Sequence, residues 1–384
     1  MVYLDYSATS PLLPEAKKAM LAAMDLVGNA SALHTPGHFA MNAIEDAREE
    51  IAKLINAEPK EILFTSGGSE SNNTITNIFA GQNVAVSAIE HPSLLESARL
   101  RCNATIIPVN KYGNVETLEI EPTFSLCSIM LANNELGTIN DIKKFAKAAH
   151  AKGALFHTDA TQALGKIKID VKDLGVDYMT ISSHKIGGPV GIGALYIKKA
   201  SPFTPFIVGG HQERGRRAGT YQTVNIAGFG AAAKYAREHK TWEIYEEKIR
   251  PLRDELAKRI LADIPYSSKN TPDSNSLPNI LNVSFEAAEG ESIQLYLDAE
   301  GEIITSTGSA CASGDGKPSH VIMATRNDAE IAHSSVRFSF GLDSTKKDID
   351  HVMKYLPSIV DRLQKISTLH AGKIKKEDSY YGKK

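Results

Sequence analysis

Between about residues 15 and 230, short runs rich in β-branched and aromatic residues alternate with longer amphipathic runs. The short runs each predict a strand and cover residues 61–65, 83–89, 105–109, 126–132, 154–159, 178–182 and 193–197. The longer runs predict helices over residues 40–55, 71–80, 93–100 and 142–153. This alternation indicates an α/β fold with a mostly parallel sheet and helices on both of its faces.

The pattern changes near residue 234. A long helical run covers residues 234–264, and we expect Pro251 to interrupt it. Later runs at 279–286, 293–301 and 334–341 predict a smaller α+β unit. We therefore expect a large domain over residues 14–250 and a small domain formed by residues 1–13 with 251–365. Residues 366–384 would form a polar tail.

The composition and charge of the chain only argue against certain partners and sites. The 384 residues carry a formal net charge of −2, with 42% hydrophobic and 23% charged residues. No charge excess favours a nucleic acid or a membrane as partner, and no signal sequence or membrane span is expected, so the cytoplasm is the expected compartment. The cysteines, Cys102, Cys127 and Cys311, form no CxxC pair or metal-ligand spacing, so no metal site is expected.

Lys185 lies in "SSHKIGGPVGIG", between polar residues and a glycine-rich run. An amine packed in a pocket loses its proton more easily than in water, as a Schiff-base nucleophile requires. The glycines are not a dinucleotide loop, because they lead into a strand and not into a helix. Ser182 and His184 precede the lysine at alternate positions and could face the same side.

Polar residues lie near the C-terminal ends of four predicted strands that precede Lys185, which is where open α/β sheets bind their ligands. Gly68 and Ser69 could bind an anion at a helix N-terminus, and Asp159 could pair with a positively charged ring nitrogen. The other residues of this group are His91, Asn134 and Gln162. Taken singly, each has a structural alternative: Ser69 and Asp159 as helix caps, His91 as a loop histidine, Asn134 as a turn former. Together, in this order, they describe a site for pyridoxal phosphate.

The second unit contributes two candidates. Cys311 lies among small residues in "STGSACASG", as a mobile nucleophile would, although an incidental exposed thiol is the alternative. Arg337 is expected on a strand, where its guanidinium could bind a carboxylate or form a surface ion pair. The basic run 209–220 could bind phosphate from a neighbouring subunit or form a solvated loop.

The chain is similar to the cysteine desulfurases of the NifS/IscS type, in the class V branch of the fold-type I pyridoxal-phosphate enzymes. The resemblance covers residues 2–364 and rests on "YLDYSAT", "TSGGSESNN", "EHPS", "NNELGT", "HTDATQALGK", "SSHKIGGPVGIG", "QERGRRAGT", "STGSACASG", "PSHV" and "VRFSFG". It implies a large domain with a mostly parallel seven-stranded sheet and a smaller C-terminal α+β domain.

The resemblance also implies roles for these residues. Lys185 would bind pyridoxal 5'-phosphate covalently and transfer protons, Asp159 would hold the ring nitrogen, and His91 would stack on the ring. Asn134 and Gln162 would contact the cofactor, and Asn134 with Arg337 would bind the substrate carboxylate. Cys311 would take sulfur from L-cysteine as a persulfide and release alanine. The phosphate would be bound by Gly68, Ser69, Ser182 and His184, with Thr220 reaching across a homodimer.

The resemblance leaves the acceptor open: an iron–sulfur scaffold, with Cys311 as a transient cluster ligand, or a tRNA-modifying protein. Asp315, Gly316 and Lys317 depart from the family pattern and should alter contacts with that acceptor. The alternatives on the same fold are a selenocysteine lyase or an aminotransferase. A non-catalytic sulfur carrier would use the thiol alone.

Overall fold

The structure is a computed structural model that describes residues 1–117, 123–307 and 318–367. Its largest sheet has seven strands, and the prediction of a mostly parallel sheet is confirmed. Only β8 runs antiparallel to its neighbours β2 and β7, while the other neighbours pair in parallel. The spatial order is β2 (Ile62–Thr65), β8 (Gly193–Ile197), β7 (Tyr178–Ser182), β6 (Leu155–Asp159), β5 (Leu126–Ser128), β3 (Asn83–Ser87) and β4 (Asn103–Ile107).

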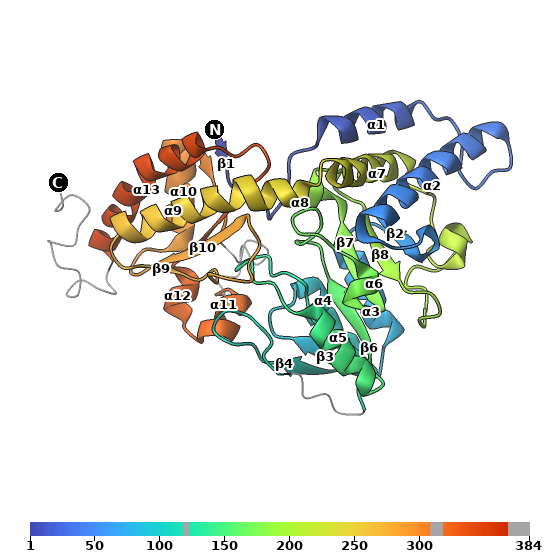
Figure 1. Cartoon of the computed structure of the whole chain (residues 1–384), viewed down its shortest axis with the longest axis horizontal. Coiled ribbons are helices and arrows are strands. Elements are labelled where there is room, and N and C mark those ends of the chain that lie inside the picture. Colours follow the sequence, from blue (N-terminus) through green and yellow to red (C-terminus); the bar gives the residue numbers. More distant parts are fainter. Residues whose placement is uncertain (118–122, 308–317, 368–384) are drawn as a thin grey trace.

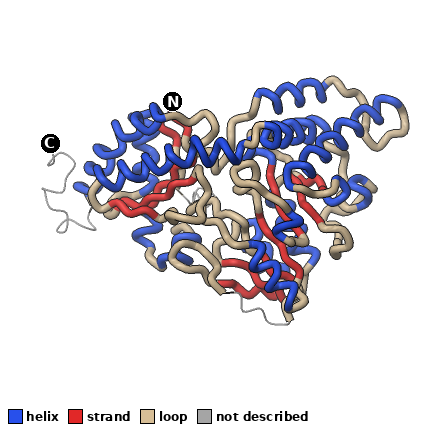
Figure 2. Tube along the Cα trace, in the orientation of Figure 1, coloured by secondary structure: helices blue, strands red, loops and turns tan. Residues whose placement is uncertain are grey.

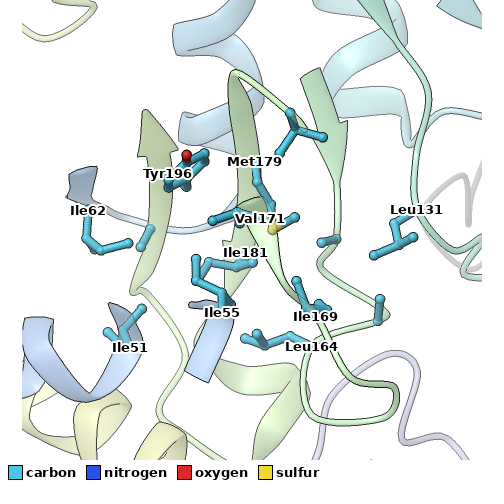
Figure 3. Close-up of a cluster of buried hydrophobic side chains, with 14 of the residues drawn as sticks. Ile51, Ile55, Ile62, Leu131, Leu164, Ile169, Val171, Met179, Ile181 and Tyr196 are labelled. Atoms are coloured by element: carbon cyan, nitrogen blue, oxygen red, sulfur yellow. The ribbon is translucent and has the colours of Figure 1, made fainter. Parts of the chain in front are cut away.

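The central strands are buried on both faces, which explains why they read as continuous apolar runs. Alternate strand residues belong to two hydrophobic clusters. One cluster joins the sheet to α2 (Thr35–Ile55), α5 (Ile142–Ala151) and α7 (Thr223–Glu238), and Figure 3 shows part of it, with Ile51 and Ile55 of α2. The other joins it to α3 (Gly68–Ile78) and α4 (Pro92–Arg101). Two further helices complete this part, α1 (Pro14–Met24) against α7 and the short α6 (Val171–Leu174).

A second, antiparallel sheet has β10 (Ile280–Phe285) between β9 (Ser267–Lys269) and β12 (Ser335–Ser339). Its core is a separate cluster that includes α9 (Arg250–Asp263), α10 (Gly290–Gly301) and α13 (Lys346–Ile366). The first residues join this part of the molecule, because β1 (Val2–Tyr3) pairs in parallel with β11 (Ile303–Ile304). Figures 1 and 2 show the two groups of strands side by side. The domain boundaries themselves stay a prediction.

The expected interruption at Pro251 is wrong. The chain breaks at Lys240, which has a left-handed φ of 45°, and then stays helical from α8 (Thr241–Ile244) to the end of α9. A π-helical turn, Tyr245–Ile249, ends two residues before the proline. Such a turn loosens the backbone ladder locally, so the proline ring and its missing N–H are tolerated. The continuous helix crosses from one part of the molecule to the other (Figure 1).

Two short helices, α11 (His320–Arg326) and α12 (Ala329–His333), connect residue 318 to β12. No helix in the described ranges is long and apolar enough to cross a membrane.

A buried ion pair fixes the basic run 209–220 to the edge of the large sheet. Arg48 of α2 donates two hydrogen bonds to Glu213, of 2.6 and 2.8 Å. The carboxylate of Glu213 also accepts from the amide of Phe64 in β2, at 3.0 Å. Arg48 is 1% exposed and Glu213 3%, so removal of the arginine leaves the Glu213 carboxylate buried without its charged partner.

We expect Arg48→Met to lower the free energy of unfolding by about 3–5 kcal/mol, because the Glu213 carboxylate would remain buried without its positively charged partner. Denaturant unfolding followed by circular dichroism measures the loss. Arg99→Met is the matched control, because Arg99 pairs with Glu96 at 2.6 Å on the surface and such pairs contribute little. Equal losses in the two variants would contradict this account.

Candidate active site

A cavity of about 370 Å³ lies where the large sheet meets the second unit. Its walls come from the C-terminal ends of parallel strands and the loops that follow them, as open α/β folds favour. It brings together ten of the twelve residues predicted from the sequence: Gly68, Ser69, His91, Asn134, Asp159, Gln162, Ser182, His184, Lys185 and Arg337.

Lys185 lies in a short 3₁₀ turn, Ser183–Ile186, directly after β7. The turn ends at Gly187, whose φ of 80° favours glycine. The amine of Lys185 donates to the carbonyl oxygens of Ser7 and Ala8, at 2.5 and 2.7 Å. Residues from the start of the chain therefore hold the amine at the cavity wall.

The main-chain carbonyl of Lys185 is held as well. It accepts a hydrogen bond from the hydroxyl of Ser10 at 3.1 Å and one from the amine of Lys166 at 3.2 Å. Lys166 is 1% exposed, and burial lowers its pKa to about 7, with a further contribution from the charge of Lys185. A second amine thus lies behind the turn that carries Lys185.

Asp159 is the last residue of β6 and is 4% exposed. One of its carboxylate oxygens accepts from the amide of Thr161 and the other from the side chain of Asn72, both at 2.9 Å. These bonds fix the orientation of the carboxylate toward the cavity that it lines. In this position it can pair with a cationic ring nitrogen.

His91 caps the N-terminus of α4, and its Nδ1 lies 2.8 Å from the hydroxyl of Ser93. Burial lowers the pKa of His91, against an opposing effect of the charge on Asp159. Burial also lowers the pKa of His184, to about 4. Both imidazoles are therefore neutral near pH 7, and His91 is able to accept a proton.

Backbone geometry at one end of the cavity suits an anion. The chain turns at Gly67, with φ 147°, and α3 begins at Gly68 with its free N–H groups and positive dipole end. A Cβ on Gly193 of β8 would lie 2.8 Å from the Cα of Gly67, so the close approach of β8 to this turn requires glycine. Ser69, Ser182 and His184 line an adjoining hollow of about 280 Å³ at this turn.

Arg337 lies on β12 and is 3% exposed. Its guanidinium donates to the carbonyl of Asn134 and to the carboxylate of Asp5, both at 2.8 Å. Its buried Nε has no hydrogen-bond partner within the described part of the chain. The structure thus places Arg337 at the cavity, with Asp5 as a partner that the sequence did not indicate.

Several buried polar atoms around the cavity lack hydrogen-bond partners among the described residues. They include Asn72 Oδ1, Thr161 Oγ1 and Gln162 Oε1, and all three residues line the cavity. Buried polar groups are almost always paired in native proteins, by protein, water or ligand. The cavity therefore suits a ligand with several polar groups.

Of the two remaining predicted site residues, only Thr220 belongs to the described part of the chain. Thr220 is exposed and does not line the cavity, and Cys311 lies outside the described residues. Within those residues, no group of three or more His, Cys, Asp or Glu side chains could hold a metal ion.

Sequence reasoning missed Asn72, Ser93 and Thr161 as residues of the cavity. Asn72 follows Ser69 by one helical turn, a spacing that could have indicated the same face of α3. Ser93 and Thr161 each lie two residues after a recognised residue, His91 and Asp159. The carbonyls that hold Lys185 belong to the backbone and have no sequence signature.

Comparisons with known proteins agree with this arrangement. The family model "Aminotransferase class-V" matches residues 2–352. A cysteine desulfurase IscS from Dictyoglomus turgidum is 42% identical over 381 residues, covering 95% of this chain and 96% of that protein. A cysteine desulfurase IscS from Clostridium botulinum is 41% identical, with 96% of each chain covered.

Solved structures give the same result. A NifS-like protein from Rickettsia africae superposes with a TM-score of 0.86 at 33% identity, covering 94% of this chain and 99% of that one. The structure of SspA in complex with cysteine gives a TM-score of 0.76 at 32% identity, covering 88% and 99%. The fold of the fold-type I enzymes is thereby confirmed, and the chain belongs to the class-V aminotransferase family, in the branch of the cysteine desulfurases of the NifS/IscS type.

Proposed function

We propose that this chain is a pyridoxal-phosphate-dependent cysteine desulfurase that transfers sulfur from L-cysteine to Cys311. The observation that carries the proposal is one cavity of about 370 Å³ that contains an amine, a fixed carboxylate and an anion-binding turn: Lys185, Asp159 and Gly68–Ser69. A pyridine ring with an aldehyde and a phosphate needs these three groups. Relatives named cysteine desulfurase, at 41–42% identity, support the choice of reaction.

The cavity fits pyridoxal 5'-phosphate by the chemistry of its donors. Lys185 would bind the cofactor covalently, Asp159 would pair with the ring nitrogen, and Gln162 and Asn134 would contact the ring oxygen. The phosphate would be bound by backbone N–H groups of Gly68 and Ser69 with the side chains of Ser69, Ser182 and His184. When bound, the cofactor supplies an electron sink for negative charge that develops on the amino acid.

The protein's own groups would bind and deprotonate the substrate. Arg337 would bind the carboxylate of L-cysteine together with Asn134; its Nε is the donor without a described partner. Lys185 and neutral His91 would accept and return protons at the amino acid. The structure of SspA with cysteine, at 32% identity, supports cysteine as the ligand.

Sulfur transfer would then use Cys311. Its thiolate attacks the substrate sulfur, and a sulfur–sulfur bond forms while the substrate's carbon–sulfur bond breaks. The electron pair of that bond stays with the carbon, which takes up a proton and becomes the methyl group of alanine. The products are L-alanine and a Cys311 persulfide, from which an acceptor such as an iron–sulfur scaffold would take the sulfur.

A homodimer is part of this proposal. Leu33 is 91% exposed and Val208 80%, so single-chain packing leaves these large apolar side chains in water. Thr220 is also exposed, and it belongs to the basic run 209–220 that directly follows Val208. In a homodimer these apolar side chains would be covered, and Thr220 would reach the phosphate of the partner chain.

Cys311→Ser should keep the cofactor and its visible absorbance but form no persulfide and release no alanine above background. Intact-mass spectrometry after addition of L-cysteine, without a reductant, detects the added sulfur. Cys102→Ser is the matched control, since Cys102 is a free, half-buried thiol that donates to the carbonyl of Thr76. Persulfide formation on Cys311→Ser at the parental level, or its loss in Cys102→Ser, would contradict the assignment.

Leu33→Asp combined with Val208→Asp should shift the protein from two chains to one in analytical ultracentrifugation, because two buried charges disfavour association. Leu295→Asp is the control, since Leu295 is 69% exposed on α10. A parental protein that sediments as a single chain would refute the homodimer.

A further inference from the structure

The N-terminus of α11 is bound to the loops that follow β3 and β5 of the large sheet. The hydroxyl of Ser319 accepts from the amide of Ile322, as an N-cap, and donates to the carboxyl group of Glu135 at 2.5 Å. The ring Nε2 of His320 lies 3.0 Å from the carbonyl oxygen of Glu90. Glu90 directly precedes His91, and Glu135 directly follows Asn134, so both contacts end beside a residue of the cavity.

Apolar packing reinforces these two contacts. Val321 and Ile322 of α11 are buried in a small cluster with Ile89, Met130 and Leu136. The last three residues follow β3 and β5 of the large sheet. The start of α11 is therefore fixed to the loops after β3 and β5 that contribute residues to the cavity, although α11 itself belongs to the later part of the chain.

Glu135 is an unusual residue for such a position. It is 3% exposed, and burial raises its pKa to about 7, against opposing effects of the Ser319 hydrogen bond and the charge of Arg337. Burial of an acid is unfavourable for stability unless its hydrogen bonds compensate. A buried acidic side chain departs from the usual preference for apolar residues in the interior, and such departures are typical of functional positions. Glutamine is close in shape to the protonated acid and can accept the same hydrogen bond.

The residues on the other side of Cys311 in the sequence are fixed to the same loop. Ser306 exchanges two backbone hydrogen bonds with Arg337, of 2.7 and 3.2 Å. Arg337 in turn donates to the carbonyl of Asn134 at 2.8 Å. Cys311 lies between Ser306 and Ser319 in the sequence, and both of these residues connect to the consecutive residues Asn134 and Glu135.

We propose that Glu135 is a positioning residue for sulfur transfer, which acts through Ser319 to fix the described end of the Cys311 segment against the substrate-binding loop. The inference rests on the proposed function. Attack by the thiolate requires the two sulfur atoms to meet within a few tenths of an ångström of the productive geometry, and a displacement of about 1 Å can slow such a step by about 100-fold. The earlier steps at Lys185 and Asp159 do not need this contact.

Glu135→Ala and Ser319→Ala should each slow the first persulfide formation on Cys311 by about 10-fold or more. The early change in cofactor absorbance after L-cysteine addition reports the steps before sulfur transfer. Its rate should stay within about 2-fold of the parental rate, because the residues proposed for those steps are unchanged in both variants. Stopped-flow absorbance and rapid quenching with intact-mass spectrometry measure the two steps separately. Glu135→Gln should restore most of the transfer rate, because the acceptor for Ser319 is kept.

Asp328→Ala is the matched control. Asp328 caps the neighbouring helix α12 through the amides of Glu330 and Ile331, so this variant loses a cap without touching Glu135. Parental transfer rates in both Glu135→Ala and Ser319→Ala would overturn the inference, as would equal slowing of both steps or of the control. If one variant fails to fold, the other carries the test. A parental protein that forms no Cys311 persulfide would instead refute the proposed function.

Discussion

The amine of Lys185 is fixed by parts of the chain that are far apart in the sequence. Its nitrogen donates to the carbonyls of Ser7 and Ala8, while its own carbonyl accepts from Ser10 and Lys166. An amine at a half-buried position needs acceptors, since loss of water without replacement is unfavourable. Two backbone carbonyls, of Ser7 and Ala8, are among these acceptors.

This constraint determines how the rest of the cavity is built. The first residues of the chain reach Lys185 because β1 pairs with β11 of the second unit and Asp5 pairs with Arg337. The same segment therefore connects the amine of Lys185 with Arg337, the arginine proposed to bind the substrate carboxylate. The α8–α9 helix, which crosses between the two parts, and the α11 contacts with Glu90 and Glu135 complete this connection.

Much of the fold could be predicted from the sequence, because buried parallel strands leave continuous apolar runs that end at polar residues. Asp159, His91 and Lys185 were recognisable because each comes at or just after such an end. Pro251 was misleading, since a π-turn that only the backbone reveals accommodates it. Asp5 and Glu135 could not be found this way, because their contacts are with partners distant in the sequence. The sequence pattern indicated Lys185 but not Lys166, a buried second amine behind the same turn, so the two amines have to be distinguished by experiment.

That last distinction gives the most direct test of the central claim, that Lys185 is the amine that binds the cofactor. The measurement is borohydride reduction of the cofactor-loaded protein, followed by proteolysis and mass spectrometry of the labelled peptide. The account predicts that the reduced cofactor is attached to Lys185 and that Lys166 is unlabelled. A cofactor attached to Lys166 or any other lysine, with Lys185 unmodified, would contradict it.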